Sequence, residues 1–277
     1  MMNHAQVVLD ACTIINLLRI DDVVTGNLYK CLKSLKPHVA GKVCEEARAN
    51  ALRNSIDEDH KEYIRNQLTR LHTDFVIHSD DEIIKAFEEG NINKVIAFSE
   101  YKKSGYNGEL YSTLMSLILS RSNESKVVFY TDDYPAKEQF SKLFEFQQIG
   151  WIDDSVCLLT TLYWMKSDFT KVKFRKALRD LRAEYTGQMN SFITVVKEEK
   201  ANLNRRDAKY TILSKIEAEY DNPKGNLDNI ATLVDRLGNV TIKRKFKAVE
   251  SIGGGRIVSR INETLQNIER LELYKKA

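Results

Sequence analysis

The chain has 277 residues, of which 43% are hydrophobic, 29% charged and 9% aromatic. These proportions are typical of a globular protein, and only 3 Pro and 12 Gly exclude collagen-like or low-complexity sequence. The longest apolar stretches, residues 7–18 and 156–165, are interrupted by Asp10 or too short to cross about 30 Å of hydrocarbon. No basic leader precedes the first of them, so we expect a cytoplasmic protein without a membrane span.

Charge is distributed unevenly along the chain. Residues 1–165 hold 18 Lys+Arg against 24 Asp+Glu, a balance of −6, whereas residues 166–277 hold 24 against 15, a balance of +9. An acidic front and a basic back fit a protein in which carboxylates bind metal and cations hold a polyanion. Charged helices that only face solvent would give the same pattern.

Short apolar runs alternate with helical patterns in the first 165 residues. Strands are expected at residues 7–9, 75–77, 127–130 and 145–149, of which 127–130 is the clearest. Residues 37–43 are expected to form a short strand or an extended turn. Helices are expected at residues 13–18, 45–70, 80–87, 93–102, 109–119 and 141–144, with a loop at 105–108. The alternation predicts an α/β domain with a central parallel sheet that helices cover on both faces.

The pattern changes after Trp164. Helices are expected at residues 169–201, 208–220 and, with an amphipathic pattern, 257–274; a turn is expected at 222–225. Residues 240–242 are the only strand candidate in this part. We therefore predict two domains, one at residues 1–165 and a mostly α-helical, basic one at residues 166–277.

Several acids of the first domain follow predicted strands or begin predicted helices. They are Asp10, Glu45, Glu46, Glu109, Asp132 and Asp133. Ligands of open parallel sheets bind beyond the carboxyl ends of the strands, so acids that follow different strands are expected at one edge of the sheet. Acids in the first turns of crossover helices face the same edge, because these helices run antiparallel to the strands.

Converging carboxylates repel one another unless a cation lies between them. Oxygen donors without nearby His or Cys favour Mg²⁺ or Mn²⁺ over zinc. Each acid also has a purely structural interpretation, since Asp10, Asp132 and Asp133 can cap helices and Glu109 can complement a helix dipole. The residues alone leave both interpretations open.

Four segments occur in order along residues 5–165. They are Val8-Leu9-Asp10-Ala11-Cys12-Thr13-Ile14-Ile15-Asn16-Leu17, Val43-x-x-Glu46, Gly108-Glu109 and Phe129-Tyr130-Thr131-Asp132-Asp133. In this order and spacing they resemble the PIN-domain nucleases. The resemblance implies a three-layer α/β/α PIN-like fold, an acidic pocket for Mg²⁺ or Mn²⁺, and cleavage of single-stranded or structured RNA.

The resemblance also implies a role for each acid. The catalytic set would be Asp10, Glu46, Glu109, Thr131, Asp132 and Asp133. The metal ligands would be Asp10, Glu109, Asp132 and Asp133, and Thr131 would orient a neighbouring carboxylate. The metal would activate water for in-line attack and leave a 5′-phosphate and a 3′-hydroxyl. Glu46 is preferred to Glu45 by its spacing from Val43 alone, so this choice stays open.

Cations and aromatic residues alternate in the second domain, a pattern that suits a single-stranded polyanion. The candidate nucleic-acid-binding residues are Lys173, Arg175, Lys176, Arg205, Arg206, Lys243, Arg244 and Lys245. Surface helices with buried phenylalanines would give the same pattern. The amphipathic helix at 257–274 is suited to contact with a second copy of the chain or with another protein.

Two classes of function fit these features. The first is a metal-dependent endoribonuclease, a toxin or defence effector that an inhibitor protein restrains. The second is a catalytically inactive PIN-like module that binds nucleic acid or protein. The presence of all four principal acids favours the first class. A flap-cleaving deoxyribonuclease is disfavoured because no arch or helix-hairpin-helix pattern is visible.

Overall fold

The computed structural model describes residues 5–52, 57–87, 89–99, 106–221, 227–251, 253 and 255–275. Their contacts divide the chain into two compact units. The first unit comprises Met1–Leu181 and Asn267–Ala277, and the second comprises Arg182–Gln266. This division differs from the expected boundary after residue 165, because the first unit also takes the start of a long helix and the C-terminal segment. No helix in the described residues is both long and apolar enough to cross a membrane.

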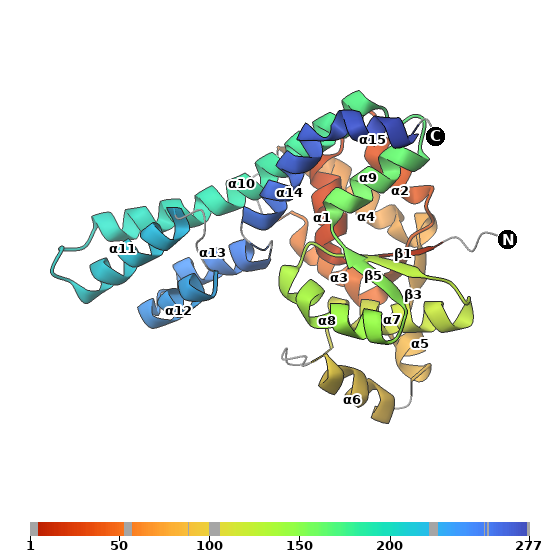
Figure 1. Ribbon diagram of the computed structural model, residues 1–277, viewed down its shortest axis with the longest axis horizontal. Helices are drawn as coiled ribbons and strands as arrows, with labels where there is room; N and C mark the ends of the chain where they lie inside the picture. The colour runs from red at the N-terminus through yellow and green to blue at the C-terminus, as the bar shows by residue number, and fades with distance from the viewer. Residues whose placement is uncertain are drawn as a thin grey trace. The chain divides into compact units, whose positions relative to one another are not determined.

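A five-stranded, fully parallel sheet forms the centre of the first unit (Figure 1). Its strands are β1 (Gln6–Leu9), β2 (His38–Ala40), β3 (Val76–His78), β4 (Val127–Tyr130) and β5 (Gly150–Asp153). Their order across the sheet is β3-β2-β1-β4-β5. The predicted α/β class with a central parallel sheet is therefore confirmed.

The burial of each strand follows from its place in the sheet. All residues of β4 are buried, as its continuous apolar sequence predicts for a strand covered on both faces. The edge strands are more open, with Val76 in β3 40% exposed and Trp151 in β5 48% exposed. Figure 1 shows α1, α4 and α9 on one side of the sheet and α7 and α8 on the other.

The helices of the first unit connect and cover these strands. They are α1 (Ala11–Ile20), α2 (Asn27–Lys33), α3 (Gly41–Asn50), α4 (Glu58–Asp74), α5 (Asp80–Lys85), α6 (Glu89–Phe98), α7 (Gly108–Ser122), α8 (Tyr134–Phe146), α9 (Ser155–Met165) and α15 (Ile268–Lys275). The first residues of α10 (Lys171–Ala201) also belong to this unit. There Lys171 forms ion pairs with Glu269 and Glu272 of α15, and the Phe174 ring stacks on Tyr163 of α9 at 4.7 Å.

The described part of the second unit is helical. It contains the rest of α10 with α11 (Ala208–Asp221), α12 (Leu227–Leu237), α13 (Val240–Ser251) and α14 (Gly255–Gln266). Phe192 and Val196 of α10 pack with apolar residues from α11, α12 and α13 in one core. Ile230, Val234, Ile242 and Phe246 are among these residues, and each is at most 3% exposed.

Two strand predictions are wrong. Residues 145–149 were expected to form the last strand, but α8 continues to Phe146 and β5 begins at Gly150. Residues 240–242 form the first turn of α13, because the Asn239 side chain accepts hydrogen bonds from the backbone N–H groups of Thr241 and Ile242. A helix cap of this kind outweighs the β-preference of three branched residues.

Two helix predictions also need correction. The single helix expected at residues 45–70 is two helices, α3 and α4, and the single helix at 257–274 is α14 followed by α15. The Asp57 side chain caps α4 by accepting from the backbone N–H of His60, which fixes a new helix start. The turn at 222–225, and residues 53–56, 100–102 and 105 of the predicted elements, lie outside the described residues.

Candidate functional site

The central strands β1 and β4 lie side by side, and the strand order reverses between them. Leu9, the last residue of β1, is opposite Tyr130, the last residue of β4. Asp10 and the Thr131-Asp132-Asp133 segment therefore leave the sheet together at its carboxyl edge. Open parallel sheets bind ligands at this kind of reversal, so the topology alone makes this edge the candidate site.

Asp10 is the most buried acid at this edge, with 3% of its surface exposed. Its Oδ2 atom accepts hydrogen bonds from Thr131 Oγ1 at 2.9 Å and from Cys12 Sγ at 3.1 Å. Its Oδ1 atom is buried and has no hydrogen-bond partner in the described part of the chain. Burial and the negative charge of Glu109 raise the pKa of Asp10 to about 6.

Glu109 enters the site from the first turn of α7. It is 6% exposed, and its Oε2 atom accepts a hydrogen bond from Asn107 Nδ2 at 3.1 Å. Asn107 also caps α7 by accepting from the backbone N–H of Leu110 at 3.1 Å. The N-terminus of α7 stabilises a carboxylate at this place, while the proximity of Glu109 to Asp10 opposes the ionisation of Asp10.

The structure distinguishes Glu46 from its neighbour Glu45. Glu46 Oε1 accepts a hydrogen bond from the backbone N–H of Gly108 at 3.0 Å, which brings this carboxylate to the start of α7 beside Glu109. A Cβ atom on residue 108 would lie 2.6 Å from Glu46 Oε2, so any larger residue there would displace the Glu46 carboxylate. Glu45 instead pairs with Lys42 at 2.9 Å on the exposed side of α3.

Asp132 and Asp133 are adjacent in sequence but have different surroundings. Asp132 is 4% exposed. Its Oδ1 atom accepts a hydrogen bond from the Ser155 N–H at 2.8 Å. Its Oδ2 atom accepts one from Asn16 Nδ2 at 2.9 Å and another from Ser155 Oγ. Both of its oxygens are thus engaged in tying α1 and α9 to the sheet edge. Asp133 is half-buried and caps α8, accepting from the backbone N–H of Ala136 at 3.3 Å.

Removal of the Asp132 carboxylate is expected to destabilise the first unit. In Asp132→Ala the Ser155 N–H and the Asn16 amide lose their acceptor while buried, which should lower the free energy of unfolding by about 2–3 kcal/mol. Chemical denaturation measures the change. Asp59→Ala, an exposed substitution in the first turn of α4, should stay within about 0.5 kcal/mol of the wild type. Equal stability of the two variants would contradict a structural role for Asp132.

The donors at this edge suit a hard divalent cation. They are carboxylate oxygens, and the unpartnered Asp10 Oδ1 atom is the kind of buried acceptor that a cation would satisfy. No three His, Cys, Asp or Glu side chains among the described residues are grouped closely enough to hold a metal ion between them. A cation at Asp10 and Glu109 would therefore depend on water and substrate phosphate for further ligands, as Mg²⁺ commonly does.

Three residues that organise this edge were not expected from the sequence. Asn16 and Ser155 hold Asp132, and Cys12 accepts a hydrogen bond from the Asp132 backbone N–H at 3.2 Å while donating to Asp10. Burial and the charges of the three neighbouring aspartates raise the pKa of the Cys12 thiol. Cys12 and Asn16 follow Asp10 by two and six residues, and this proximity was their only sequence signal.

Most of the eight predicted nucleic-acid-binding cations already have partners. Lys173, Arg175 and Lys176 are on α10 in the first unit, and the other five belong to the second unit. Arg175 pairs with Glu269, Lys176 with Asp180 and Lys243 with Asp235, while Lys173 and Lys245 donate to the Asp168 carbonyl and to Ser191 Oγ. For Arg205, Arg206 and Arg244 the described residues supply no ion pair.

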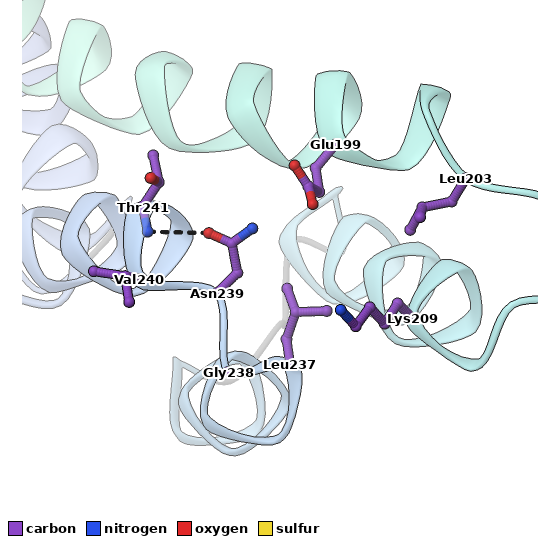
Figure 2. A pocket seen from close by; sticks show the side chains of 8 residues that line it. All are labelled: Glu199, Leu203, Lys209, Leu237, Gly238, Asn239, Val240 and Thr241. Atoms are coloured by element: carbon purple, nitrogen blue, oxygen red, sulfur yellow. Dashed lines mark hydrogen bonds between the residues drawn. The ribbon is translucent and has the colours of Figure 1, made fainter.

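The second unit contains a small hollow of about 330 Å³, whose lining residues Figure 2 shows. Asn239, at the start of α13, accepts the backbone hydrogen bond of Thr241 there. Glu199 and Lys209 contribute opposite charges to the lining. None of the predicted site residues lines this hollow.

Comparison with known proteins gives no independent assignment of the site. No family model, no curated protein and no solved structure matches the chain. The residues and geometry of the sheet edge therefore define the candidate site.

Proposed function

We propose that the first unit is a metal-dependent endoribonuclease that cleaves single-stranded or structured RNA. The observation that carries the proposal is the buried pair Asp10 and Glu109 at the reversal of a parallel sheet, with one Asp10 oxygen unpartnered. A buried carboxylate whose pKa is raised by a second carboxylate is typical of functional sites. The resemblance of residues 5–165 to the PIN-domain nucleases agrees with this interpretation and extends the proposal to a PIN-like fold.

The acids of the sheet edge have separate tasks in the proposed reaction. Asp10 and Glu109 would hold Mg²⁺ or Mn²⁺ together with water and substrate phosphate, and the bound ion would supply an activated water and stabilise charge on the leaving oxygen. Asp133 instead caps α8 through the backbone N–H of Ala136. Thr131 orients Asp10 through the hydrogen bond from its hydroxyl, so that Asp10 Oδ1 stays available. Asp132 holds the Thr131-Asp132-Asp133 segment in place, because both of its oxygens accept hydrogen bonds from Asn16 and Ser155.

Glu46 acts on the site through the start of α7. Its hydrogen bond from the Gly108 N–H fixes the first turn of that helix and hence the direction of Glu109. The side chains of Arg205, Arg206 and Arg244 would contact the RNA phosphates outside the cleavage site. We further propose a cytoplasmic toxin or defence effector, with an inhibitor protein or a second copy of the chain as its partner.

Removal of divalent metal tests the proposed activity. End-labelled single-stranded RNA is incubated with the full-length protein in Mg²⁺ or Mn²⁺, in EDTA, and in EDTA with excess Mn²⁺ restored. We expect cleavage with metal, products with a 5′-phosphate and a 3′-hydroxyl, loss of cleavage in EDTA and recovery on restoration. Single-stranded DNA of the same sequence serves as the competing substrate. Cleavage that persists in EDTA, or products with a 2′,3′-cyclic phosphate, would contradict the mechanism.

A second candidate function is a binding module without turnover. The observation that favours it is that two of the predicted site acids have structural hydrogen bonds: Asp132 accepts from Asn16 and Ser155, and Asp133 caps α8. One measurement distinguishes the two functions. A binding module would slow the migration of RNA in a mobility-shift assay and leave the RNA intact in Mn²⁺, whereas the nuclease would cleave it.

A further inference from the structure

The first unit has a second hollow, of about 740 Å³, between the segment that follows α1 and the helices α2 and α4. Lys36, which lines it, precedes β2, and Gln67 and Arg70, which also line it, lie near the end of α4 before β3. The hollow is therefore beside the amino ends of the strands, whereas the acids leave their carboxyl ends. Its volume is within the range of about 300–1,000 Å³ that is usual for small-molecule sites.

Four cations line this hollow: Lys30, Lys33, Lys36 and Arg70. A single carboxylate, Asp74, pairs with two of them, at 2.5 Å from Lys33 and 3.5 Å from Arg70. Lys30 Nζ donates to the Thr25 carbonyl, which leaves its charge uncompensated, and Lys36 has no ion pair within the described residues. Asp21, which accepts a hydrogen bond from the lining residue Tyr63, is a second carboxylate beside the hollow. The four cations still outnumber these two carboxylates, and the excess of positive charge favours an anion.

Buried hydrogen bonds hold the floor of the hollow in place. Tyr63 Oη donates to Asp21 Oδ2 at 2.5 Å, and Tyr29 Oη donates to Asp74 Oδ2 at 3.1 Å. Asp21 also accepts from the backbone N–H groups of Leu28 and Tyr29, each at 2.9 Å, and so fixes the start of α2. A ligand would meet walls that are already formed, which reduces the entropy lost on binding.

Beside the cations, the hollow offers a group suited to a nucleobase. Gln67 lines the hollow, and its Oε1 atom is enclosed by protein without a hydrogen-bond partner in the described residues, so the side chain must turn to present its amide to a ligand. An amide carries a donor and an acceptor side by side, the arrangement that pairs with the edge of a base. Val24, which is 92% exposed, and Val23, which is 37% exposed, add apolar surface that a flat ring can cover.

We propose that this hollow binds a nucleotide through its phosphate and its base. The phosphate is held by Lys30, Lys36 and Arg70, and the base is recognised by Gln67 against the valines. Either a free nucleotide or the phosphorylated end of an RNA has this chemistry. The site is separate from the acidic edge, so the proposal stands whether or not the protein cleaves RNA.

Binding is measured on the full-length protein in EDTA, so that metal-dependent cleavage does not interfere. The probes are adenosine 5′-monophosphate, inorganic phosphate, and a short fluorescent RNA with either a 5′-phosphate or a 5′-hydroxyl. We expect Lys36→Ala and Arg70→Ala each to raise the Kd about tenfold, equivalent to about 1.4 kcal/mol, because each removes a charge-assisted contact. Lys142→Ala, an exposed lysine of α8, is the matched control and should bind as the wild type does.

The probes separate the two ligand sources and the two parts of the site. Binding of adenosine monophosphate supports a free nucleotide, and binding only of the 5′-phosphorylated RNA supports an RNA end. Gln67→Leu should remove the preference for adenosine monophosphate over inorganic phosphate while leaving phosphate binding intact. The proposal is overturned if neither nucleotide probe binds, if inorganic phosphate binds the wild type as tightly as the nucleotide, or if Lys142→Ala weakens binding as much as Lys36→Ala. Asp10→Asn should retain this binding, which distinguishes failure here from failure of the nuclease proposal.

Discussion

Replacement of Asp10 by asparagine is expected to lower the rate of RNA cleavage by roughly 10²- to 10³-fold or more, the usual effect of removing one electrostatic contact to a transition state. The substitution keeps the shape of the side chain and an acceptor for the hydrogen bond from Thr131. It removes the charge that would hold the cation beside Glu109. Single-turnover cleavage of labelled RNA in Mn²⁺ measures the loss, and Asp59→Asn, at an exposed residue in the first turn of α4, is the control. Equal activity of Asp10→Asn and the wild type would mean that a contaminant cleaves the RNA.

Asp10→Asn is expected to lower activity but to raise the stability of the folded protein at neutral pH. The pKa of Asp10 is about 6 in the folded protein and 3.8 in a model carboxyl, so the native state binds the proton more tightly than the unfolded state does. The stability contributed by the protonated group is present at low pH and is lost as pH rises from about 4 through 6. Asp10→Asn should therefore raise the free energy of unfolding at pH 7.5, by on the order of 2–3 kcal/mol without metal, and change it little at pH 4.

Metal addition provides the complementary measurement. A cation bound only by the folded state stabilises it by mass action, so Mn²⁺ should raise the melting temperature of the wild type at pH 7.5. Asp10→Asn should show a smaller increase, because it lacks the charge that binds the ion. A variant that is inactive, less stable at pH 7.5 and equally responsive to Mn²⁺ would indicate that Asp10 is only a structural residue.

Gly150→Ala is expected to be the most destabilising single-methyl change in the sheet. Gly150 begins β5 opposite Val127 of β4, with a φ of +154°, and a Cβ atom there would lie 1.9 Å from the Val127 carbonyl oxygen. Backbone cannot move aside as a flexible side chain can, so the β4–β5 pairing must open. We expect the free energy of unfolding to fall by about 3 kcal/mol or more.

Thermal unfolding followed by circular dichroism measures this effect. A loss of about 3 kcal/mol corresponds to a decrease in melting temperature of roughly 6–12 °C for a unit of this size. Gly187→Ala on α10 is the matched control, because a Cβ atom there meets no other atom within 4 Å. Alanine is the better helix former, so the control should be unchanged or slightly stabilised. A melting temperature for Gly150→Ala equal to that of the control would contradict the structure at β5.

A strand can be predicted from local sequence when its own residues show the hydrophobic pattern of a strand. The run Val127–Tyr130 is apolar at every position, and this pattern by itself predicts a strand that is buried on both faces. The start of β5 cannot be found this way. Gly150 and Trp151 have no alternating pattern, and the strand is defined by pairing with β4, whose residues are more than twenty positions earlier.

The amino-acid sequence by itself determined the α/β class, the position of β4 and the convergence of Asp10 with Asp132 and Asp133, because residues that follow parallel strands must leave the sheet at one edge. Only the tertiary structure decided which acids are available there. Both oxygens of Asp132 accept hydrogen bonds from Asn16 and Ser155. Glu46, and not Glu45, lies at the site because it accepts a hydrogen bond from the Gly108 N–H. These hydrogen bonds join residues between 23 and 116 positions apart, so no local pattern can encode them.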